Sequence, residues 1–198
     1  RQMCIRDSLR MAYSMEIERR FIVDGRANKP WRDGSDSNYI RQYYIPYDRF
    51  ALSENCLLYE GSKLTELTDE ESEIISNNDS FTSRIRITQD KSILTLKGKR
   101  NHASAIELEW EIESPLAEKI TTSNDFPQIE KVRFYWVGED GIVWEIDEFE
   151  GSLAGLILAE VELENETQEV VLPKWLGMEL TGLHNWSNAA LAQTLAKK

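Results

Sequence analysis

Charged side chains recur at every second position in several short stretches of this 198-residue chain. Because successive side chains of a β-strand point to opposite faces, residues two positions apart share one face. An ordinary half-buried strand mixes Ser, Thr, Lys and Glu on its polar side, whereas these stretches are sorted by sign. The sorted pairs are acidic in Glu16/Glu18, Glu109/Glu111 and Glu160/Glu162, and basic in Arg84/Arg86, Lys97/Lys99 and Lys131/Arg133. The pattern predicts a closed β-barrel with a charged bore, able to hold a polyanion and the metal ions that accompany it.

Nine stretches have the length and alternation of β-strands, and turn-forming residues separate them. They are residues 15–23, 38–46, 48–58, 81–88, 92–98, 105–113, 129–138, 141–149 and 155–164. Between two aromatic-rich strands, Gly138-Glu139-Asp140-Gly141 predicts a hairpin turn. Many antiparallel strands with few helices favour a barrel over a sandwich, because a sandwich buries apolar faces whereas a closed bore can stay polar.

Three further segments have helical signals. Residues 64–76 are acidic and predict either a short helix or a solvated loop. Ser114 followed by Pro115 predicts a helix to about residue 123, with the serine as N-cap and the proline as first helical residue. Ser187 is a candidate cap for a C-terminal helix over residues 188–196. The predicted fold is therefore mainly β (α+β), a closed antiparallel barrel with a few peripheral helices and a C-terminal helix.

The charge of the chain limits its partners. A formal net charge of −12 argues against nucleic acid or an anionic membrane as a partner of the outer surface. A local basic cluster can still hold an anionic ligand inside. No run approaches 18 apolar residues, so no membrane span is expected. Cys4 and Cys56 match no metal spacing and favour a reduced, cytoplasmic setting.

Residues 1–14 differ from the acidic remainder, since Arg1, Arg6 and Arg10 stand against a single Asp7. They also lack the apolar core of a signal peptide. We expect a non-native or disordered extension here, with Met15 as the native start. Residues 15–198 have a suitable length for a single domain with a substantial core.

The basic pairs have the residue types that bind phosphate. A triphosphate-like chain needs cations that converge from more than one side, and Arg offers planar, often bidentate contacts to phosphate oxygens. The candidate anion-binding residues are Arg20, Arg84, Arg86, Lys97, Lys131 and Arg133. The alternative is that each pair is a solvated outer face. Three basic pairs on separate strands favour the bore.

The acidic pairs would repel phosphate unless a cation lies between them. Mg²⁺ and Mn²⁺ prefer oxygen ligands, commonly one or two carboxylates together with water and substrate phosphates. The candidate metal ligands are Glu16, Glu18, Asp147, Glu160 and Glu162, and Glu109 either contributes to the bore or pairs with its cations. A metal-bound water can attack a terminal phosphoryl group without any nucleophilic side chain. Glu16 and Glu18 are candidates for holding the metal and orienting water.

The charged segments resemble, in order, those of a known family. The stretch Met15-Glu-Ile-Glu-Arg-Arg-Phe-Ile-Val23 is similar to the amino-terminal ExExK signature of the CYTH domain, or triphosphate tunnel metalloenzymes. Further similar segments are Ile40-Arg-Gln-Tyr-Tyr-Ile45, Arg84-Ile-Arg86, Leu94-Thr-Leu-Lys-Gly98, Glu109-Trp-Glu111, Glu130-Lys-Val-Arg133, Trp144-Glu-Ile-Asp-Glu-Phe-Glu-Gly151, Leu158-Ala-Glu-Val-Glu-Leu163 and Leu172-Pro-Lys-Trp-Leu-Gly177. The resemblance covers about residues 15–192.

The resemblance implies an eight-stranded antiparallel tunnel that uses Mg²⁺ or Mn²⁺. It implies phosphate contacts from Arg20, Arg84, Arg86, Lys97, Lys131 and Arg133, and metal-site roles for Glu16, Glu18, Asp147, Glu160 and Glu162. The chain looks most like the small bacterial members, among which hydrolysis of inorganic tripolyphosphate is common. Other members are thiamine triphosphatases and class IV adenylate cyclases. A third reading, from another class, is a module that binds polyphosphate or nucleotides without turnover. In each case we expect a monomer or homodimer.

Three positions depart from the family pattern. The lysine of the signature is Arg20, which keeps the charge but not the compact ammonium group. The glycine of the second similar segment is Tyr43. Where small bacterial members often have a basic segment near the C-terminus, this chain has Leu183-His-Asn-Trp186. The last change bears on turnover and substrate preference more than on the fold.

Overall fold

The computed structural model describes residues 14–26, 28–99 and 104–196, and the side chains of residues 14–16 and 104 fall outside that description. The described part is mainly β, with antiparallel strands and three α-helices, as predicted. The strands of the larger sheet are β1 (Ser14–Val23), β2 (Asp36–Ile45), β6 (Thr82–Ile87), β7 (Ser92–Lys97), β8 (Ser104–Ile112), β9 (Gln128–Val137), β10 (Val143–Phe149), β11 (Ile157–Glu162) and β12 (Leu176–Glu179).

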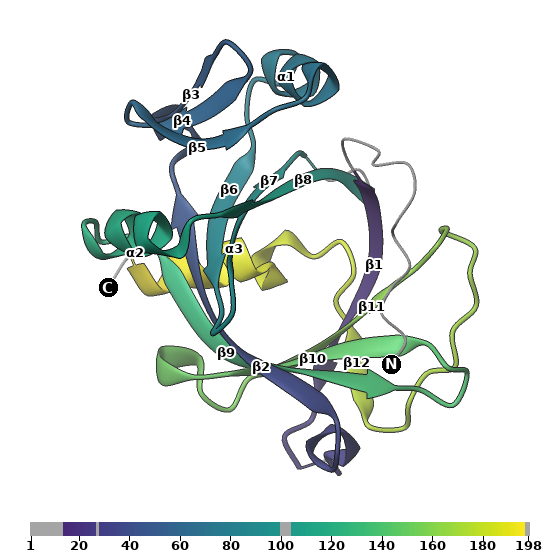
Figure 1. Cartoon of the computed structure of the whole chain (residues 1–198). Helices are drawn as coiled ribbons and strands as arrows, with labels where there is room; N and C mark the ends of the chain where they lie inside the picture. The colour runs from purple at the N-terminus through teal and green to yellow at the C-terminus, as the bar shows by residue number, and fades with distance from the viewer. Residues whose placement is uncertain (1–13, 27, 100–103, 197–198) are drawn as a thin grey trace.

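Eight of these strands are arranged around a common centre (Figure 1). Antiparallel pairing joins them in the order β11-β10-β9-β2-β6-β7-β8-β1, and β1 also pairs with β11. That last pairing runs from the partners Glu18↔Glu162 to Ile22↔Leu158. Each of the eight strands therefore has a hydrogen-bonded neighbour on both sides. β12 pairs with the end of β1 next to Val23.

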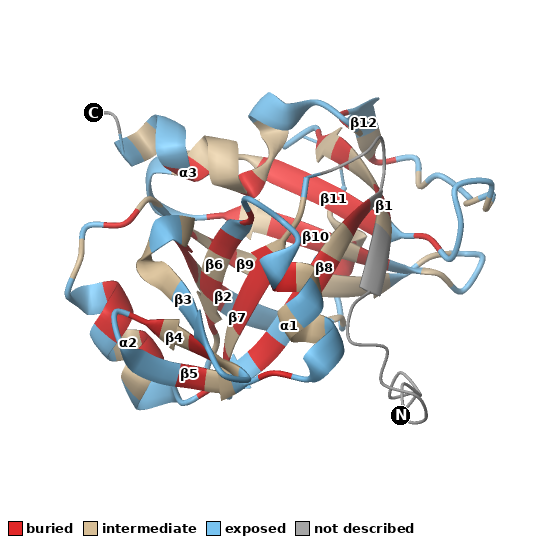
Figure 2. Cartoon of the chain, turned by 90° about the horizontal axis from the view of Figure 1, so that it is seen from above, coloured by how far each residue is buried: buried red, intermediate tan, exposed pale blue. Residues whose placement is uncertain are grey.

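A small sheet and two helices cover one side of this ring. The small sheet has the strands β3 (Phe50–Ser53), β4 (Cys56–Tyr59) and β5 (Ser62–Glu66), and the helices are α1 (Asp69–Ser76) and α2 (Ser114–Thr122). The third helix, α3 (Asn188–Ala196), follows the short 3-10 helix η4 (His184–Trp186). Figure 2 shows α3 at one end of the ring, apart from α1.

The period-two alternation of the strands separates an apolar outer face from a charged inner one. On β7 and β8, Leu94, Leu96 and Leu108 are fully buried against the small sheet, α1 and α2. Burial of apolar side chains is the main favourable term for such packing. Lys97, next to Leu96, and Glu107, next to Leu108, form an ion pair on the opposite face. The charged face is thus directed toward the middle of the ring.

Apolar residues fill the end of the ring that α3 covers. Tyr44, Phe149, Leu158 and Leu180 form one buried cluster with Ala192 of α3. Several of these residues lie on the same strand faces as the charged ones, because Phe149 follows Asp147 by two and Leu158 precedes Glu160 by two. The strands are therefore apolar where they pack against α3 and charged farther along the same faces.

Some element predictions are wrong. Residues 48–58 form the β3–β4 hairpin and not one strand, with Glu54 at a φ of 52° in its turn. The short helix predicted within residues 64–76 is confirmed by α1, whose capping box joins Thr68 and Glu71, although the first residues of this range belong to β5. β12 lies in a stretch for which no strand was predicted. The hairpin at Gly138–Gly141 is confirmed by the bond from the Gly138 N–H to the Ile142 carbonyl, at 2.8 Å.

The two serine caps have different outcomes. Ser114 is the first residue of α2, so the N-cap position falls on Glu113 and the prediction is wrong by one residue. Ser187 caps α3 as predicted, since its Oγ accepts a hydrogen bond from the Ala190 N–H at 3.2 Å.

Two further expectations concern membranes and thiols. In the ranges that the structure covers, no helix has the length and apolar character needed to cross a membrane. Cys56 is a free cysteine on β4. Cys4 and the rest of residues 1–13, which make up most of the expected extension, lie outside the described residues.

Candidate active site

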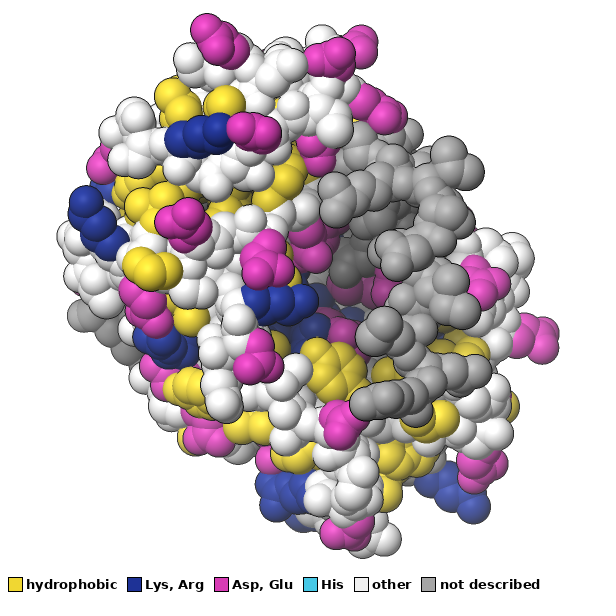
Figure 3. All heavy atoms as spheres, viewed as in Figure 1, with side chains coloured by type: hydrophobic (Ala, Val, Ile, Leu, Met, Phe, Trp, Pro, Cys, Tyr) yellow, Lys and Arg dark blue, Asp and Glu magenta, His cyan; other side chains and the backbone are white. Residues whose placement is uncertain are grey.

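Two adjoining cavities occupy the middle of the ring. The smaller one, the charged cavity, has a volume of about 190 Å³ and is lined by Glu18, Arg20, Gln42, Arg84, Arg86, Lys97, Glu107, Glu109, Lys131, Arg133, Glu145, Glu160, Glu162 and Asn188. Figure 3 shows blue and magenta side chains at the bottom of a hollow in the same view as Figure 1. The lining contains six cations and six carboxylates, so the charged cavity is formally neutral.

The larger cavity, the side cavity, has a volume of about 430 Å³. It shares Glu18, Arg20, Arg84, Lys97 and Asn188 with the charged cavity. Its other residues are mostly uncharged and come from the segment before and at the start of α3 and from the ends of β2, β6 and β7: Tyr44, Thr82, Gly98, Lys99, Leu180, Gly182, Leu183, His184, Ser187 and Ala189.

On the β6–β8 side of the charged cavity, three cations face two carboxylates. Arg84 Nη2 lies 3.1 Å from Glu107 Oε1 and 3.7 Å from Glu109 Oε1. Arg86 Nη2 lies 3.7 Å from the same Glu109 oxygen. Lys97 Nζ lies 3.2 Å from Glu107 Oε2. The longer separations are loose contacts, so these cations can turn toward a ligand with little loss.

On the β9–β11 side, the ion pairs are shorter and more buried. Lys131 Nζ is 2.5 Å from Asp147 Oδ2, and Arg133 donates from Nε and Nη2 to the two Asp147 oxygens at 2.7 Å each. Arg133 also contacts Glu145 and, at 3.4 Å, Glu160 Oε2. The register that makes Arg133 and Asp147 direct partners brings these groups together. Both oxygens of Asp147 are thereby used to hold Lys131 and Arg133.

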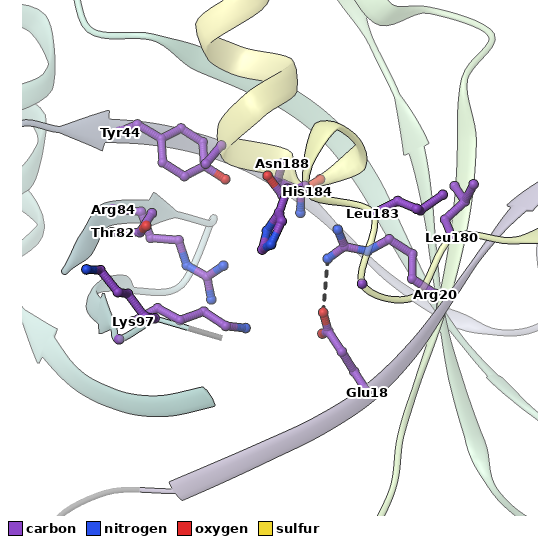
Figure 4. Close-up of a pocket in the computed structure, with 15 residues that line it drawn as sticks. Glu18, Arg20, Tyr44, Thr82, Arg84, Lys97, Leu180, Leu183, His184 and Asn188 are labelled. Atoms are coloured by element: carbon purple, nitrogen blue, oxygen red, sulfur yellow. Dashed lines mark hydrogen bonds and ion pairs between the residues drawn. The ribbon is translucent and has the colours of Figure 1, made fainter. Parts of the chain in front are cut away.

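Arg20 connects β1, β11 and the segment before α3. Its Nε is 2.5 Å from Glu160 Oε1, and its Nη2 is 3.2 Å from Glu18 Oε1. Its Nη1 donates to the Trp186 carbonyl at 3.0 Å. Figure 4 shows Arg20 and Glu18 opposite Arg84 and Lys97, with Asn188 and His184 between the two sides. Arg20 makes these contacts from three different nitrogens, whereas a lysine would have to reach all three partners from a single nitrogen.

The electrostatics of the charged cavity differ between its members. Burial, together with repulsion by Arg84 and Arg133, lowers the pKa of Arg86 from its usual value. Burial raises the pKa of Glu145, although Arg133 opposes this effect. For Glu109, burial acts upward, but Arg86 and Arg84 outweigh it, so its pKa is lowered. Arg86 is thus a cation in excess of its counter-charges, which favours an added anion.

The pKa values of the two buried cations on β9, Lys131 and Arg133, shift in opposite directions. Burial and the neighbouring Arg133 lower the pKa of Lys131 to about 8, in spite of attraction by Asp147. For Arg133, attraction by Asp147 and Glu145 outweighs the burial penalty, so its pKa is raised. A further negative charge near Lys131 would favour its protonated form.

The structure brings most of the candidate site residues together. Those that line the charged cavity are Glu18, Arg20, Arg84, Arg86, Lys97, Glu109, Lys131, Arg133, Glu160 and Glu162. Asp147 is not among the lining residues and lies behind Lys131 and Arg133. The side chain of Glu16 falls outside the described residues, although its backbone belongs to β1.

Four lining residues were not among the candidates. Glu107 and Glu145 each precede a candidate by two positions, so strand alternation could have identified both. Gln42 is buried on β2, and its amide donates to the Tyr44 hydroxyl. Asn188 lies at the start of α3, where no charge pattern points to it.

The residues that line the charged cavity fit a divalent cation only if a bound polyanion supplies some of the cation's oxygen ligands. Within the described ranges, no three His, Cys, Asp or Glu side chains are placed to hold a metal ion by themselves. Register nevertheless makes Glu18 and Glu162 direct partners, and likewise Glu145 and Glu160. Like charges placed opposite each other across strands repel. Since Mg²⁺ is commonly held by one or two carboxylates plus phosphate oxygens, the donor set fits a cation that arrives with a polyanion.

An antiparallel β protein with cations and carboxylates facing each other in an internal cavity belongs to the class that binds small charged ligands. Comparison with known proteins narrows this class. The chain is 32% identical, over 179 residues, to an inorganic triphosphatase of Acetivibrio thermocellus, a match that covers 90% of this chain and 93% of the relative. It is also 32% identical over 119 residues to an inorganic triphosphatase of Nitrosomonas europaea, covering 59% and 78%.

A solved structure agrees with these relatives. The crystal structure of an inorganic triphosphatase matches with a TM-score of 0.56 and 25% sequence identity, over 90% of this chain and 95% of that one. No family model matches the sequence. The identity and coverage of the first relative show that the chain belongs to the inorganic triphosphatase family.

Proposed function

We propose that this protein is a metal-dependent hydrolase of inorganic tripolyphosphate, acting inside a closed tunnel formed by the eight-strand ring. The observation that carries the proposal is the formally neutral lining of the charged cavity, in which cations and carboxylates are equal in number. A bare polyanion would gain little in such a cavity, because the six carboxylates of the lining offset its six cations. A polyanion accompanied by divalent cations can pair with both kinds of side chain at once: the phosphates contact the Lys and Arg residues, and the divalent cations contact the carboxylates.

The reaction breaks one phosphoanhydride bond and forms one bond from water oxygen to phosphorus. Tripolyphosphate and water give pyrophosphate and hydrogen phosphate, with release of one proton. No covalent intermediate on the protein is required. The contribution of the chain is to bind the phosphates, align the terminal one and stabilise the charge that builds on its oxygens.

The binding roles follow from the two sides of the charged cavity. The cations of the β6–β8 side, Arg84, Arg86 and Lys97, would contact the phosphate oxygens directly. Lys131 and Arg133, fixed by Asp147, would form the rigid part of the same anion site. Asp147 is therefore assigned a positioning role here, in place of the metal-ligand role that the sequence predicts, because both of its oxygens are taken up by cations.

The metal would be held by the acidic wall. Glu18, Glu160 and Glu162 line the charged cavity on β1 and β11, and the resemblance adds Glu16. A bound Mg²⁺ or Mn²⁺ would supply charge neutralisation at the phosphate oxygens and a more acidic water. Arg20, between Glu18 and Glu160, would keep the two carboxylates apart and directed toward the cavity.

A substrate panel tests the proposal. We expect purified protein to release phosphate from tripolyphosphate with Mg²⁺ or Mn²⁺, and to lose at least 100-fold of the rate with excess EDTA, a loss within the range of metal-assisted hydrolysis. Phosphate release, pyrophosphate formation and nucleotide products are measured side by side for tripolyphosphate, ATP and thiamine triphosphate. Equal rates with and without EDTA would contradict the metal requirement.

The same panel separates the alternative activities. A thiamine triphosphatase would release phosphate fastest from thiamine triphosphate. An adenylate cyclase would cleave ATP at the α-phosphate and give cyclic AMP with pyrophosphate. A non-catalytic binding module would bind tripolyphosphate tightly, with no product from any substrate.

A further inference from the structure

The start of α3 enters the side cavity with polar groups that have no partner. Asn188 is the first residue of α3 and lines both cavities. Its side chain is buried, at 7% exposure, and its Oδ1 accepts no hydrogen bond from the described residues. A buried amide oxygen left unsatisfied costs about 1–3 kcal/mol, so a structural asparagine at this position would be expected to have a partner.

The backbone at this helix start adds two more donors. The Ser187 Oγ accepts from the Ala190 N–H, and the Ser187 carbonyl accepts from the Leu191 N–H. In the described part of the chain, no acceptor is found for the N–H groups of Asn188 and Ala189. Free N–H groups at a helix N-terminus, with the partial positive charge of the helix dipole, favour an anion.

The surrounding charges agree with an anion at this place. Arg84 and Lys97 line the side cavity from β6 and β7. Arg20 fixes the approach to α3 by donating to the Trp186 carbonyl. The segment from Leu180 to Ala189 contains no Lys or Arg, and besides its amides it offers the cavity the Ser187 hydroxyl and the His184 ring. Figure 4 shows Asn188 directed into the space between Arg20 and Arg84.

We propose that the start of α3 is a binding site for a terminal phosphoryl group, with Asn188 as a further substrate-binding residue. Its NH₂ group donates to a phosphate oxygen, and its Oδ1 accepts from a P–OH group, which hydrogen phosphate carries at neutral pH. A side-chain amide offers both a donor and an acceptor to such a group. The site rests on the proposed function, because the phosphoryl group is either the end of the substrate or the released phosphate.

The test compares Asn188→Ala and Asn188→Asp with Asn185→Ala as the matched control, since Asn185 is exposed in η4 and lines neither cavity. Binding of inorganic phosphate is measured by ³¹P NMR titration without turnover, and KM for tripolyphosphate is measured with Mg²⁺. We expect phosphate binding to weaken about 5- to 10-fold in Asn188→Ala, the loss of roughly one hydrogen bond. Asn188→Asp adds a like charge and is expected to weaken binding further.

Stability distinguishes binding from a structural role. The Asn188 side chain makes no hydrogen bond to the described residues. Asn188→Ala is therefore expected to leave the urea midpoint of unfolding unchanged or to raise it, whereas replacing a structural asparagine would lower that midpoint. A raised KM together with weaker phosphate binding assigns the site to the substrate end, and weaker phosphate binding alone assigns it to the product. Phosphate binding and KM within twofold of wild type in both variants would overturn the proposal. If the wild-type protein hydrolyses no substrate but the Asn188 variants still lose phosphate binding, the proposed activity is refuted and the binding site is not.

Discussion

Glu160→Gln is expected to lower the metal-dependent hydrolysis of tripolyphosphate by about 100-fold or more, the size seen when a preorganised electrostatic partner of the transition state is removed. The Glu160 carboxylate lies between two guanidinium groups, with Arg20 Nε at 2.5 Å and Arg133 Nη2 at 3.4 Å. Its charge balances these arginines, and in the proposed function it also holds a divalent cation. The amide keeps the size of the side chain and removes only the charge. Initial rates at saturating Mn²⁺ measure the effect.

The control for this variant is Glu164→Gln. Glu164 is exposed, lies two residues beyond the end of β11 and undergoes the same change of charge. We expect its rate to stay within about twofold of wild type. Circular dichroism and thermal unfolding check that Glu160→Gln is folded. A folded Glu160→Gln protein with the wild-type rate would remove this carboxylate from the active site.

Asp147→Asn is expected to lower the free energy of unfolding by about 3–5 kcal/mol, the usual cost of removing one member of a buried ion-pair network. Asp147 is only 1% exposed, and its two oxygens pair with Lys131 and Arg133. Without the carboxylate, Lys131 and Arg133 both lose a fully buried ion-pair partner, although Arg133 keeps its contacts with Glu145 and Glu160. Urea denaturation followed by tryptophan fluorescence measures the loss. Glu139→Gln, at an exposed hairpin position, is the control and should change stability by less than about 0.5 kcal/mol.

The difference in free energy of unfolding between wild type and Asp147→Asn should depend on pH, because the Asp147 carboxyl titrates. Burial acts to raise its pKa, but Arg133 and Lys131 outweigh burial and hold the pKa well below its usual range. A group with a depressed pKa in the folded state stabilises fully above its unfolded pKa, near 3.9 for Asp. That stabilisation is lost as pH falls through the lower folded pKa. The gap between wild type and Asp147→Asn should therefore shrink as the pH falls below about 4. A gap that stays constant to pH 2 would contradict the assignment.

The charged interior could be predicted from sequence because strand alternation is a local property. Arg84 and Arg86 share a face whatever strand lies beside them, and the same holds for Lys131 and Arg133. Whether that face is inside or outside depends on where the apolar partners lie. Here Leu94, Leu96 and Leu108 bury the other face, so the charged face is left to the cavity.

The depth and the partners of each charge could not be predicted, because they depend on register between distant strands. Asp147 has the same alternation as Glu145, yet its register places it opposite Arg133, and it is taken up by that cation and Lys131. Asn188 carries no sequence signal at all, since a lone asparagine before an Ala-rich helix is ordinary capping chemistry. Likewise β12 has only four residues, too few for its alternation to be distinguished from a loop.

Arg20 is a departure from the family signature that the structure explains. The guanidinium reaches Glu18, Glu160 and the Trp186 carbonyl at once. The carboxylates raise its pKa although burial opposes them. The residue thus joins the acidic wall to the segment that leads into α3, where the basic residues common in small bacterial members are absent.

Manganese anomalous scattering from a crystal soaked with tripolyphosphate and Mn²⁺ would locate the anion and the cation in one experiment. Rapid soaking, or the Glu160→Gln protein if turnover is too fast, would keep the ligand intact. We expect phosphate density against Arg84, Arg86 and Lys97, and a manganese peak between that density and the Glu18/Glu162 wall. Tripolyphosphate bound on the outer surface, or a charged cavity free of manganese at saturating concentrations of both, would contradict a substrate held together with its cations between walls of opposite charge.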